Sequence, residues 1–172
     1  MTVLLKALAR TIATGLLLSL CFAIAPARAG SAPQLFDSAT WKTLNDSHKG
    51  RPLIVHFWGL TCGNCMVELS DWGRFAKEHP GVEIAFVNWD RRGAKPARIA
   101  QALTKAGLAG VQNFVLANGF EEKLRFAVDR DWMGELPYTR LIDGDGKVTT
   151  FSGTADFKKL SRWLEAEKTS ER

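Results

Sequence analysis

The fold is decided by one stretch of sequence, Leu53-Ile54-Val55-His56-Phe57-Trp58-Gly59-Leu60-Thr61-Cys62-Gly63-Asn64-Cys65. Its first six residues form a nearly continuous apolar run, which is typical of a central strand covered on both faces. A helix is predicted from about Asn64 to His79, and Pro80-Gly81 ends it. The run from Val82 to Asn88 is rich in β-branched and aromatic residues and predicts a second strand. The order strand, helix, strand indicates a parallel βαβ unit in a protein of the α/β class.

Weaker patterns before and inside this unit give two further expectations. Residues 31–35 are expected to form a loose lead, and a short helix that starts at Asp37 or Ser38 follows it. For the helix after the cysteines, four apolar residues are predicted to face inward: Met66, Leu69, Phe75 and Ala76.

The second half of the chain predicts the remaining elements. We expect a helix over residues 96–106, a short strand over 114–116 and a helical face formed by Phe120, Leu124 and Val128. Strands at 139–143 and 148–151 flank Gly144-Asp145-Gly146-Lys147 and predict a hairpin, and an amphipathic helix over about 155–167 closes the chain.

Composition and charge exclude several classes of protein. The 172 residues are 46% hydrophobic and 24% charged, which fits one globular core and neither a disordered chain nor a fibre. The net charge is +5, but Lys6, Arg10 and Arg28 lie in the first 29 residues, which leaves 20 of the 23 basic residues against 18 acidic ones. This even mixture argues against a nucleic-acid partner.

The first 29 residues are predicted to be an export signal. Lys6 and Arg10 form a positive start, Ile12 to Ala25 is almost wholly apolar, and Ala27-Arg28-Ala29 is a small-x-small cleavage site. Residues 30–172 are then the expected domain, exported to the periplasm or a similar oxidising compartment and soluble after cleavage. The alternative is a retained signal that anchors the chain, although a spanning helix needs about 20 apolar residues and this stretch is shorter.

Cys62 and Cys65 are the residues whose pattern indicates chemistry. A thiolate at a helix N-terminus faces free backbone N–H groups and the positive end of the helix dipole, so the pKa of Cys62 is expected to fall below the ~8.5 of free cysteine. Two intervening residues in one helical turn bring Cys65 close enough to form a disulfide. Cys62 is therefore the candidate nucleophile and Cys65 the candidate resolving thiol.

Other uses of the two cysteines fit the sequence less well. A structural zinc site needs four ligands, and beyond these sulfurs the sequence offers only His48, His56 and His79, with neither a second CxxC motif nor the spacing of paired histidines on a helix. Covalent haem attachment needs a histidine where Met66 stands. A disulfide that closes so short a loop removes little chain entropy, which argues against a purely structural bond. A copper-binding or copper-relay module that uses Cys62, Cys65 and Met66 stays open, because thiolate and thioether ligands suit Cu(I).

Two separated motifs carry a family resemblance. Phe57-Trp58-x-x-Thr61-Cys62-Gly63-Asn64-Cys65 is followed about seventy residues later by Leu136-Pro137-Tyr138-Thr139-Arg140-Leu141-Ile142-Asp143-x-Asp145-Gly146-Lys147-Val148. Together they resemble the thioredoxin superfamily, and within it the exported TlpA/ResA-like thiol-disulfide oxidoreductases. The resemblance spans about residues 37–165. It implies a central mixed β-sheet flanked by helices, with the extra strand and helix that this branch inserts between residues 88 and 132.

The resemblance also implies roles for residues outside the CxxC motif. Pro137 is expected to be cis and to pack opposite the cysteines, with Leu136 offering backbone groups to an extended substrate segment. Glu68 corresponds to the acid that tunes the dithiol in this branch; a solvated helix residue is the alternative. His56 stands where thioredoxins often keep a buried acid, so it either accepts the proton of Cys65 or is only a hydrogen-bonded core residue. Trp58 is expected to rim the site and contact substrate.

The direction of exchange is left open by departures from the family pattern. Thr61 replaces a usual Trp, and Gly63-Asn64 replaces a dipeptide with Pro. A backbone donor at Asn64 favours the reduced form and a more oxidising couple, so a disulfide-forming oxidant is one alternative. We expect a reductant, because the branch mostly reduces exported proteins such as cytochrome c precursors. Its partners are then protein thiols and disulfides and a membrane-bound electron carrier, without a bound cofactor.

Overall fold

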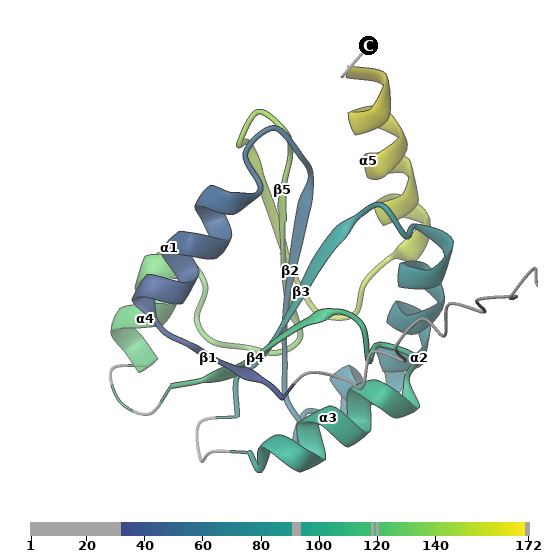
Figure 1. Ribbon diagram of the computed structural model, residues 1–172. Helices are drawn as coiled ribbons and strands as arrows, with labels where there is room; N and C mark the ends of the chain where they lie inside the picture. Colours follow the sequence, from purple (N-terminus) through teal and green to yellow (C-terminus); the bar gives the residue numbers. More distant parts are fainter. Residues whose placement is uncertain (1–31, 91–93, 118, 120, 171–172) are drawn as a thin grey trace, which may run out of the picture.

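The computed structural model describes residues 32–90, 94–117, 119 and 121–170, which form a mixed six-stranded sheet with helices on both faces (Figure 1). The predicted signal, residues 1–29, and Phe120 of the predicted helical face lie outside the described residues. In chain order the elements are β1 (Gln34–Phe36), α1 (Ser38–Ser47), β2 (Leu53–Trp58), α2 (Gly63–Glu78), β3 (Glu83–Asn88), α3 (Pro96–Lys105), β4 (Gln112–Leu116), α4 (Glu121–Val128), β5 (Tyr138–Ile142), β6 (Val148–Ser152) and α5 (Phe157–Ser170). In the part of the chain described, no helix is long and apolar enough to cross a membrane.

The sheet places β2 and β3 at its centre in the order β1-β4-β3-β2-β5-β6. β1, β4, β3 and β2 run parallel to one another, whereas β5 pairs antiparallel with both β2 and β6. The predicted βαβ unit and hairpin are therefore present. β4 and α4 lie between β3 and β5 in the chain, as the resemblance implies.

The sheet separates two hydrophobic cores because β2 is buried on both faces. Leu53, Val55 and Phe57 pack toward α1 and α4, whereas Ile54 and Trp58 pack toward α2, α3 and α5. Figure 1 shows these two sets of helices on opposite sides of the sheet. We call the first the α1–α4 core and the second the α2 core. The period of two along a strand produces this division.

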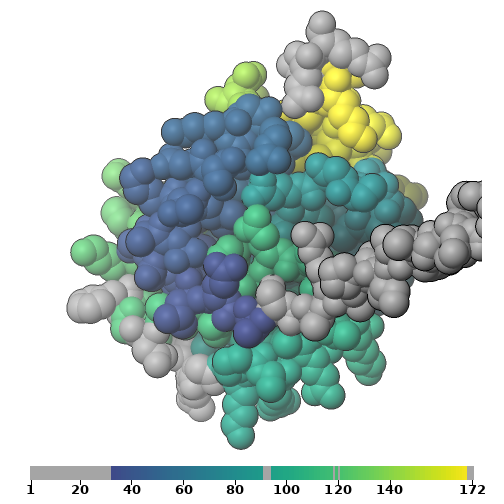
Figure 2. Space-filling model, viewed as in Figure 1, coloured from purple at the N-terminus to yellow at the C-terminus, as the bar shows by residue number. Residues whose placement is uncertain are grey.

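Two expectations from sequence are wrong. Residues 34–36 are not a loose lead but the edge strand β1, in which Phe36 is the one buried side chain, so the segment is too short to show a period. Met66 does not face inward: its side chain is 41% exposed, and the buried stripe of α2 consists of Cys65, Glu68, Leu69, Trp72, Gly73 and Phe75. In the view of Figure 2, the residues of α1 and β1, in blue and purple, form one continuous surface.

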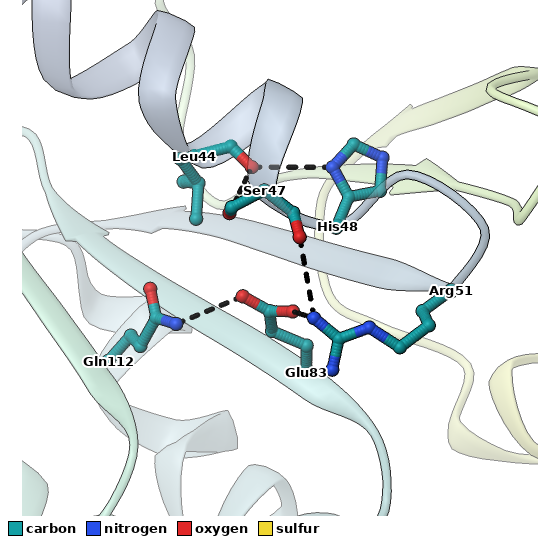
Figure 3. Close-up of polar contacts among 6 residues, drawn as sticks. All are labelled: Leu44, Ser47, His48, Arg51, Glu83 and Gln112. Carbon is teal, nitrogen blue, oxygen red and sulfur yellow. Dashed lines mark hydrogen bonds and ion pairs between the residues drawn. The ribbon is translucent and has the colours of Figure 1, made fainter.

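Surface polar contacts hold together the end of the sheet where β2 and β3 begin (Figure 3). The Arg51 guanidinium lies 3.4 Å from a carboxylate oxygen of Glu83, and the Gln112 amide donates to the other oxygen at 2.9 Å. These contacts link the starts of β2, β3 and β4. The opposite end of the sheet, where β2 ends and α2 begins, carries the two cysteines.

Candidate active site

Cys62 and Cys65 form a disulfide across the first turn of α2, with an S–S distance of 2.06 Å. Cys62 is the N-cap residue of α2, and its sulfur accepts the backbone N–H of Cys65 at 3.1 Å. Cys62 is half-buried and lies beside the exposed Gly63 and Asn64, whereas Cys65 is fully buried. Of the two sulfurs, that of Cys62 is therefore the one that a partner can reach.

The loop before Cys62 is bound to one carboxylate from the end of β3. Asp90 accepts the backbone N–H of Leu60 at 2.7 Å, the hydroxyl of Thr61 at 2.8 Å and the backbone N–H of Thr61 at 3.4 Å. The buried Asn88 donates its side-chain amide to the same carboxylate at 2.9 Å. Burial alone would raise the pKa of Asp90, but these hydrogen bonds outweigh it and hold the pKa below its usual value. Asp90 is thus ionised at neutral pH.

A buried polar cluster lies in the α2 core. His56 is fully buried between the rings of Trp72 and Phe86, at centroid distances of 4.6 and 5.3 Å. Its Nδ1 lies 3.0 Å from the Thr139 hydroxyl, and its Nε2 lies 3.2 Å from a carboxylate oxygen of Glu68. The contact with Thr139 is a hydrogen bond, whereas Nε2 and the Glu68 oxygen lie within ion-pair distance without hydrogen-bond geometry. Burial lowers the pKa of His56, and the nearby Glu68 opposes that shift without cancelling it.

Glu68 joins this cluster to the start of α5. It is only 3% exposed, and its second carboxylate oxygen accepts the backbone N–H of Ala155 at 2.9 Å. The alternative of a solvated helix residue is therefore wrong for Glu68. Cys65, one turn earlier on α2, belongs to the same buried stripe. The position three residues after Cys65 thus holds a carboxylate that faces the core.

The peptide bond between Leu136 and Pro137 is cis, as the resemblance implies. The Pro137 carbonyl accepts the backbone N–H of Gly153 at 2.8 Å, and the Trp132 indole donates to the carbonyl of Glu135 at 2.9 Å. Leu136 packs against both the α1–α4 core and the α2 core. It also lies beside Gly59, where an added Cβ would come 3.3 Å from its Cδ1. The segment before β5 therefore borders the loop that leads to Cys62.

The structure brings most of the predicted residues to one end of the sheet. His56, Glu68, Cys62 and Cys65 come from β2 and α2, and Leu136-Pro137 from the neighbouring segment before β5. Trp58 needs correction: it is fully buried in the α2 core, so it has no surface with which to rim the site or contact substrate. Its place at the end of a strand buried on both faces explains this.

Asp90 and Asn88 are site residues that the sequence analysis missed. The available signal was Asn88-x-Asp90 directly after the strand predicted to pair with the cysteine-bearing one, because the carboxyl ends of parallel strands meet at one edge of a sheet. Within the described residues, no group of three or more His, Cys, Asp and Glu side chains is arranged to hold a metal ion.

Comparisons with known proteins yield solved structures alone. No family model and no curated protein matches the sequence. A secreted disulfide oxidoreductase of Mycobacterium tuberculosis, homologous to DsbE of E. coli, is 20% identical with a TM-score of 0.54 over 81% of this chain and 97% of that one. A thiol:disulfide interchange protein of the thioredoxin family from Chlorobium tepidum TLS is 19% identical with a TM-score of 0.58 over 72% and 83%.

The fold is thioredoxin-like. A third solved structure, MTB dsbF in its mixed oxidised and reduced forms, has a similar fold, with 19% identity and a TM-score of 0.53 over 82% of this chain and 97% of that one. In this thioredoxin-like chain the paired cysteines, the buried carboxylate and the cis proline occupy one end of the sheet.

Proposed function

We propose that the protein is a thiol-disulfide oxidoreductase that exchanges disulfides with exported proteins through Cys62 and Cys65. One observation carries the proposal: a reachable sulfur at the N-terminus of α2 is bonded to a fully buried one. This asymmetry gives the two sulfurs different tasks. The outer thiolate meets the partner, and the inner one acts after a partner is bound.

The exchange proceeds in two steps when the protein acts as a reductant. The Cys62 thiolate attacks one sulfur of a partner disulfide, and the other partner sulfur leaves as a thiolate. The Cys65 thiolate then attacks the Cys62 sulfur in the mixed disulfide, which releases the second partner sulfur and forms the Cys62–Cys65 bond. The partner gains two electrons, its thiolates take up protons, and this protein loses two electrons.

Residues around the disulfide have supporting roles in this proposal. The backbone at Leu136-Pro137 pairs with an extended segment of the partner in the manner of an added strand. His56 on β2 and Glu68 on α2 are buried on the same side of the sheet as Cys65, and in this proposal His56 accepts the proton that Cys65 releases before its attack. Their burial and mutual contact support these roles.

The proposed direction is reduction, in an exported compartment. The predicted signal in residues 1–29 supports export, and the resemblance to the TlpA/ResA-like branch supports reduction of proteins such as cytochrome c precursors. A reductant in an oxidising compartment must be recharged, so a membrane-bound electron carrier is the proposed donor. The chain needs no bound cofactor for this chemistry.

The decisive experiment is trapping with Cys65→Ser in cells that export the full chain. This variant keeps Cys62 at its helix terminus and removes the resolving thiol, so mixed disulfides with partners accumulate. Non-reducing electrophoresis and mass spectrometry identify them, with Cys62→Ser/Cys65→Ser as the matched control. Partners that normally end as dithiols support a reductant, whereas newly exported chains that normally acquire disulfides indicate an oxidant. Trapping no greater than in the double variant rejects exchange with proteins.

A copper-relay module is the second candidate, because the Met66 thioether is exposed next to Cys65 in the chain. Titration of the reduced protein with Cu(I) separates the two functions. Tight binding of one Cu(I), weakened by Met66→Leu and accompanied by little insulin-reducing activity, favours copper. Rapid insulin reduction that Met66→Leu leaves intact favours disulfide exchange.

A further inference from the structure

The loop Gly59–Thr61 is held by Asp90 rather than by its own backbone. Both backbone N–H groups at Leu60 and Thr61 and the Thr61 hydroxyl are directed at this one carboxylate, while the N–H of Cys62 closes a turn on the Gly59 carbonyl at 3.2 Å. The backbone position of Cys62 therefore depends on where Asp90 lies. Unpaired backbone donors at this partly buried place would cost free energy, so the contacts are a strong constraint.

Asn88 fixes the position of the Asp90 carboxylate. Asn88 is fully buried at the end of β3, donates its amide to Asp90 and accepts the Asp90 backbone N–H at 3.4 Å. On the other side the loop lies so close that a Cβ at Gly59 would come 2.8 Å from the carboxylate. There is no room for a side chain at Gly59 and little freedom for Asp90. The loop, the carboxylate and Leu136 form one tightly packed unit.

Asp90 also places an ionised carboxylate against Leu60 and Thr61, the two residues that precede Cys62. The first turn of α2 contains no acidic residue, and no described Lys, Arg or His forms an ion pair with Asp90. Ionisable groups on neighbouring elements include Glu68 and His56 in the α2 core, Asp71 and Arg74 further along α2, Glu135 before β5 and Asp156 before α5. A fixed negative charge disfavours formation of a nearby thiolate, so it opposes the effect of the helix N-terminus.

We propose that Asp90 is the positioning residue for Cys62: its carboxylate fixes the loop that presents this cysteine, and its charge keeps the thiolate fraction lower than the helix N-terminus alone would give. The inference rests on the proposed function and deepens it. A less stabilised thiolate makes the reduced form less favourable, and the couple becomes more reducing. The charge of Asp90 thus adjusts the chemistry in the direction that a reductant needs, and the hydroxyl of Thr61, which donates to the carboxylate, moderates that effect.

The test compares Asp90→Asn with Thr61→Val in the reduced full-length chain. Alkylation of Cys62 is followed against pH by peptide mass spectrometry, which separates it from Cys21 and Cys65. Asp90→Asn keeps the shape of the side chain and removes its charge, so the pKa of Cys62 falls and the thiolate at pH 6 increases about three- to tenfold. The reduction potential becomes more oxidising. Thr61→Val removes a donor that neutralises the carboxylate, so the pKa of Cys62 rises and alkylation slows.

A merely structural role of Asp90 predicts slower alkylation in both variants, because both loosen the loop. Effects of the same sign, or an unchanged pKa in Asp90→Asn, overturn the proposal. If Asp90→Asn does not fold, the pKa of Cys62 in Thr61→Val decides: an unchanged or lowered pKa contradicts the proposal, because a loosened loop alone slows alkylation of the fully ionised thiolate without raising its pKa. Asp143→Asn is the matched control: Asp143 accepts the Lys147 backbone N–H at 2.7 Å in the hairpin at the other end of β5, and its change leaves Cys62 unaffected. Alkylation needs no protein partner, so failure here and failure of Cys65→Ser trapping are distinguishable.

Discussion

The two cores on either side of the sheet differ in their side-chain composition. The α1–α4 core is a continuous set of rings in which Phe57 contacts Phe36, Trp89, Trp132 and Tyr138 at centroid distances of 4.7 to 5.9 Å. The α2 core contains large apolar residues as well, but it also buries a histidine and a carboxylate. A buried polar group costs free energy unless it is paired, so the second core retains groups that stability alone does not favour. His56 and Glu68 lie on the side of the sheet that carries the cysteines, whereas the buried His48 lies at the end of α1 and contacts the Leu44 carbonyl.

The largest effect is expected in the aromatic core. Trp132 is 1% exposed and stacks on Tyr138 at 4.7 Å, so Trp132→Ala leaves a large cavity and lowers the free energy of unfolding by about 3–5 kcal/mol. Urea denaturation measures it. Met133→Ala is the control, because Met133 is 77% exposed and its loss should change stability by less than about 0.5 kcal/mol. Similar losses in the two variants would show that the aromatic stack is not a rigid core.

A smaller loss is expected when the polar cluster is broken. Glu68→Ala leaves the backbone N–H of Ala155 without its acceptor and removes the contact to His56, which lowers the free energy of unfolding by about 1–3 kcal/mol. Glu68→Gln keeps an acceptor for Ala155 and should lose less. Both values come from denaturant unfolding of the oxidised protein. If Gln and Ala destabilise equally, the hydrogen bond to Ala155 contributes nothing.

The two cores should also respond to acid in different pH ranges. The pKa of His56 is lowered by burial, so the unfolded chain binds the proton more readily; stability is complete above the ordinary value of 6.5 and falls as pH decreases below it toward the folded pKa. His56→Gln should flatten this part of the stability curve.

Asp129 beside the α1–α4 core behaves differently. Burial raises its pKa, but hydrogen bonds led by that from Tyr138 outweigh it, so the folded pKa lies below 3.8. Its contribution is present above pH 3.8 and is lost only as pH falls through the lower folded pKa. Asp129→Asn should therefore leave the change near pH 6 intact. Thermal unfolding across pH for both variants checks this, and a change near pH 6 that survives in His56→Gln would assign it to another group.

The smallest effect is expected at the surface, where the exposed ion pair Arg51–Glu83 can be compared with the buried contact between His56 and Glu68. Arg51 is 67% exposed beside Glu83, so Arg51→Ala should cost less than about 1 kcal/mol. A double-mutant cycle with Glu83→Gln, repeated at high salt, isolates the pair. If the Arg51–Glu83 coupling energy is as large as the fall in the free energy of unfolding in Glu68→Ala, then polar contacts at the surface and in the core contribute equally to stability.

Elements with a strong local pattern could be predicted from the sequence. β2, α2, β3 and the β5–β6 hairpin follow from apolar runs and turn residues that lie within a few positions of one another. β1 could not, because its three residues acquire strand structure only by pairing with β4. The inward position predicted for Met66 rests on its apolar side chain alone and is wrong, because the buried stripe of α2 contains the charged Glu68 instead.

The cysteine pair could likewise be predicted, because its spacing and its place after a strand are local features. The contacts of Asp90 could not: they depend on how the end of β3 lies against the loop after β2, and these segments are 30 residues apart in the chain. The contact between His56 and Glu68 depends on how α2 packs on β2. Tertiary packing decides both, and a single sequence carries little record of it.

Leu136 touches both cores at the end of the sheet where the cysteines lie. The position of the Leu136 side chain depends on packing on both sides of the sheet, because a shift of either core moves the residues that it contacts. The residue that precedes Pro137 is therefore mechanically linked to aromatic rings on the face opposite to Cys65. A packing defect around Trp132 can therefore alter the proposed exchange reaction without unfolding the protein, because it changes the position of Leu136.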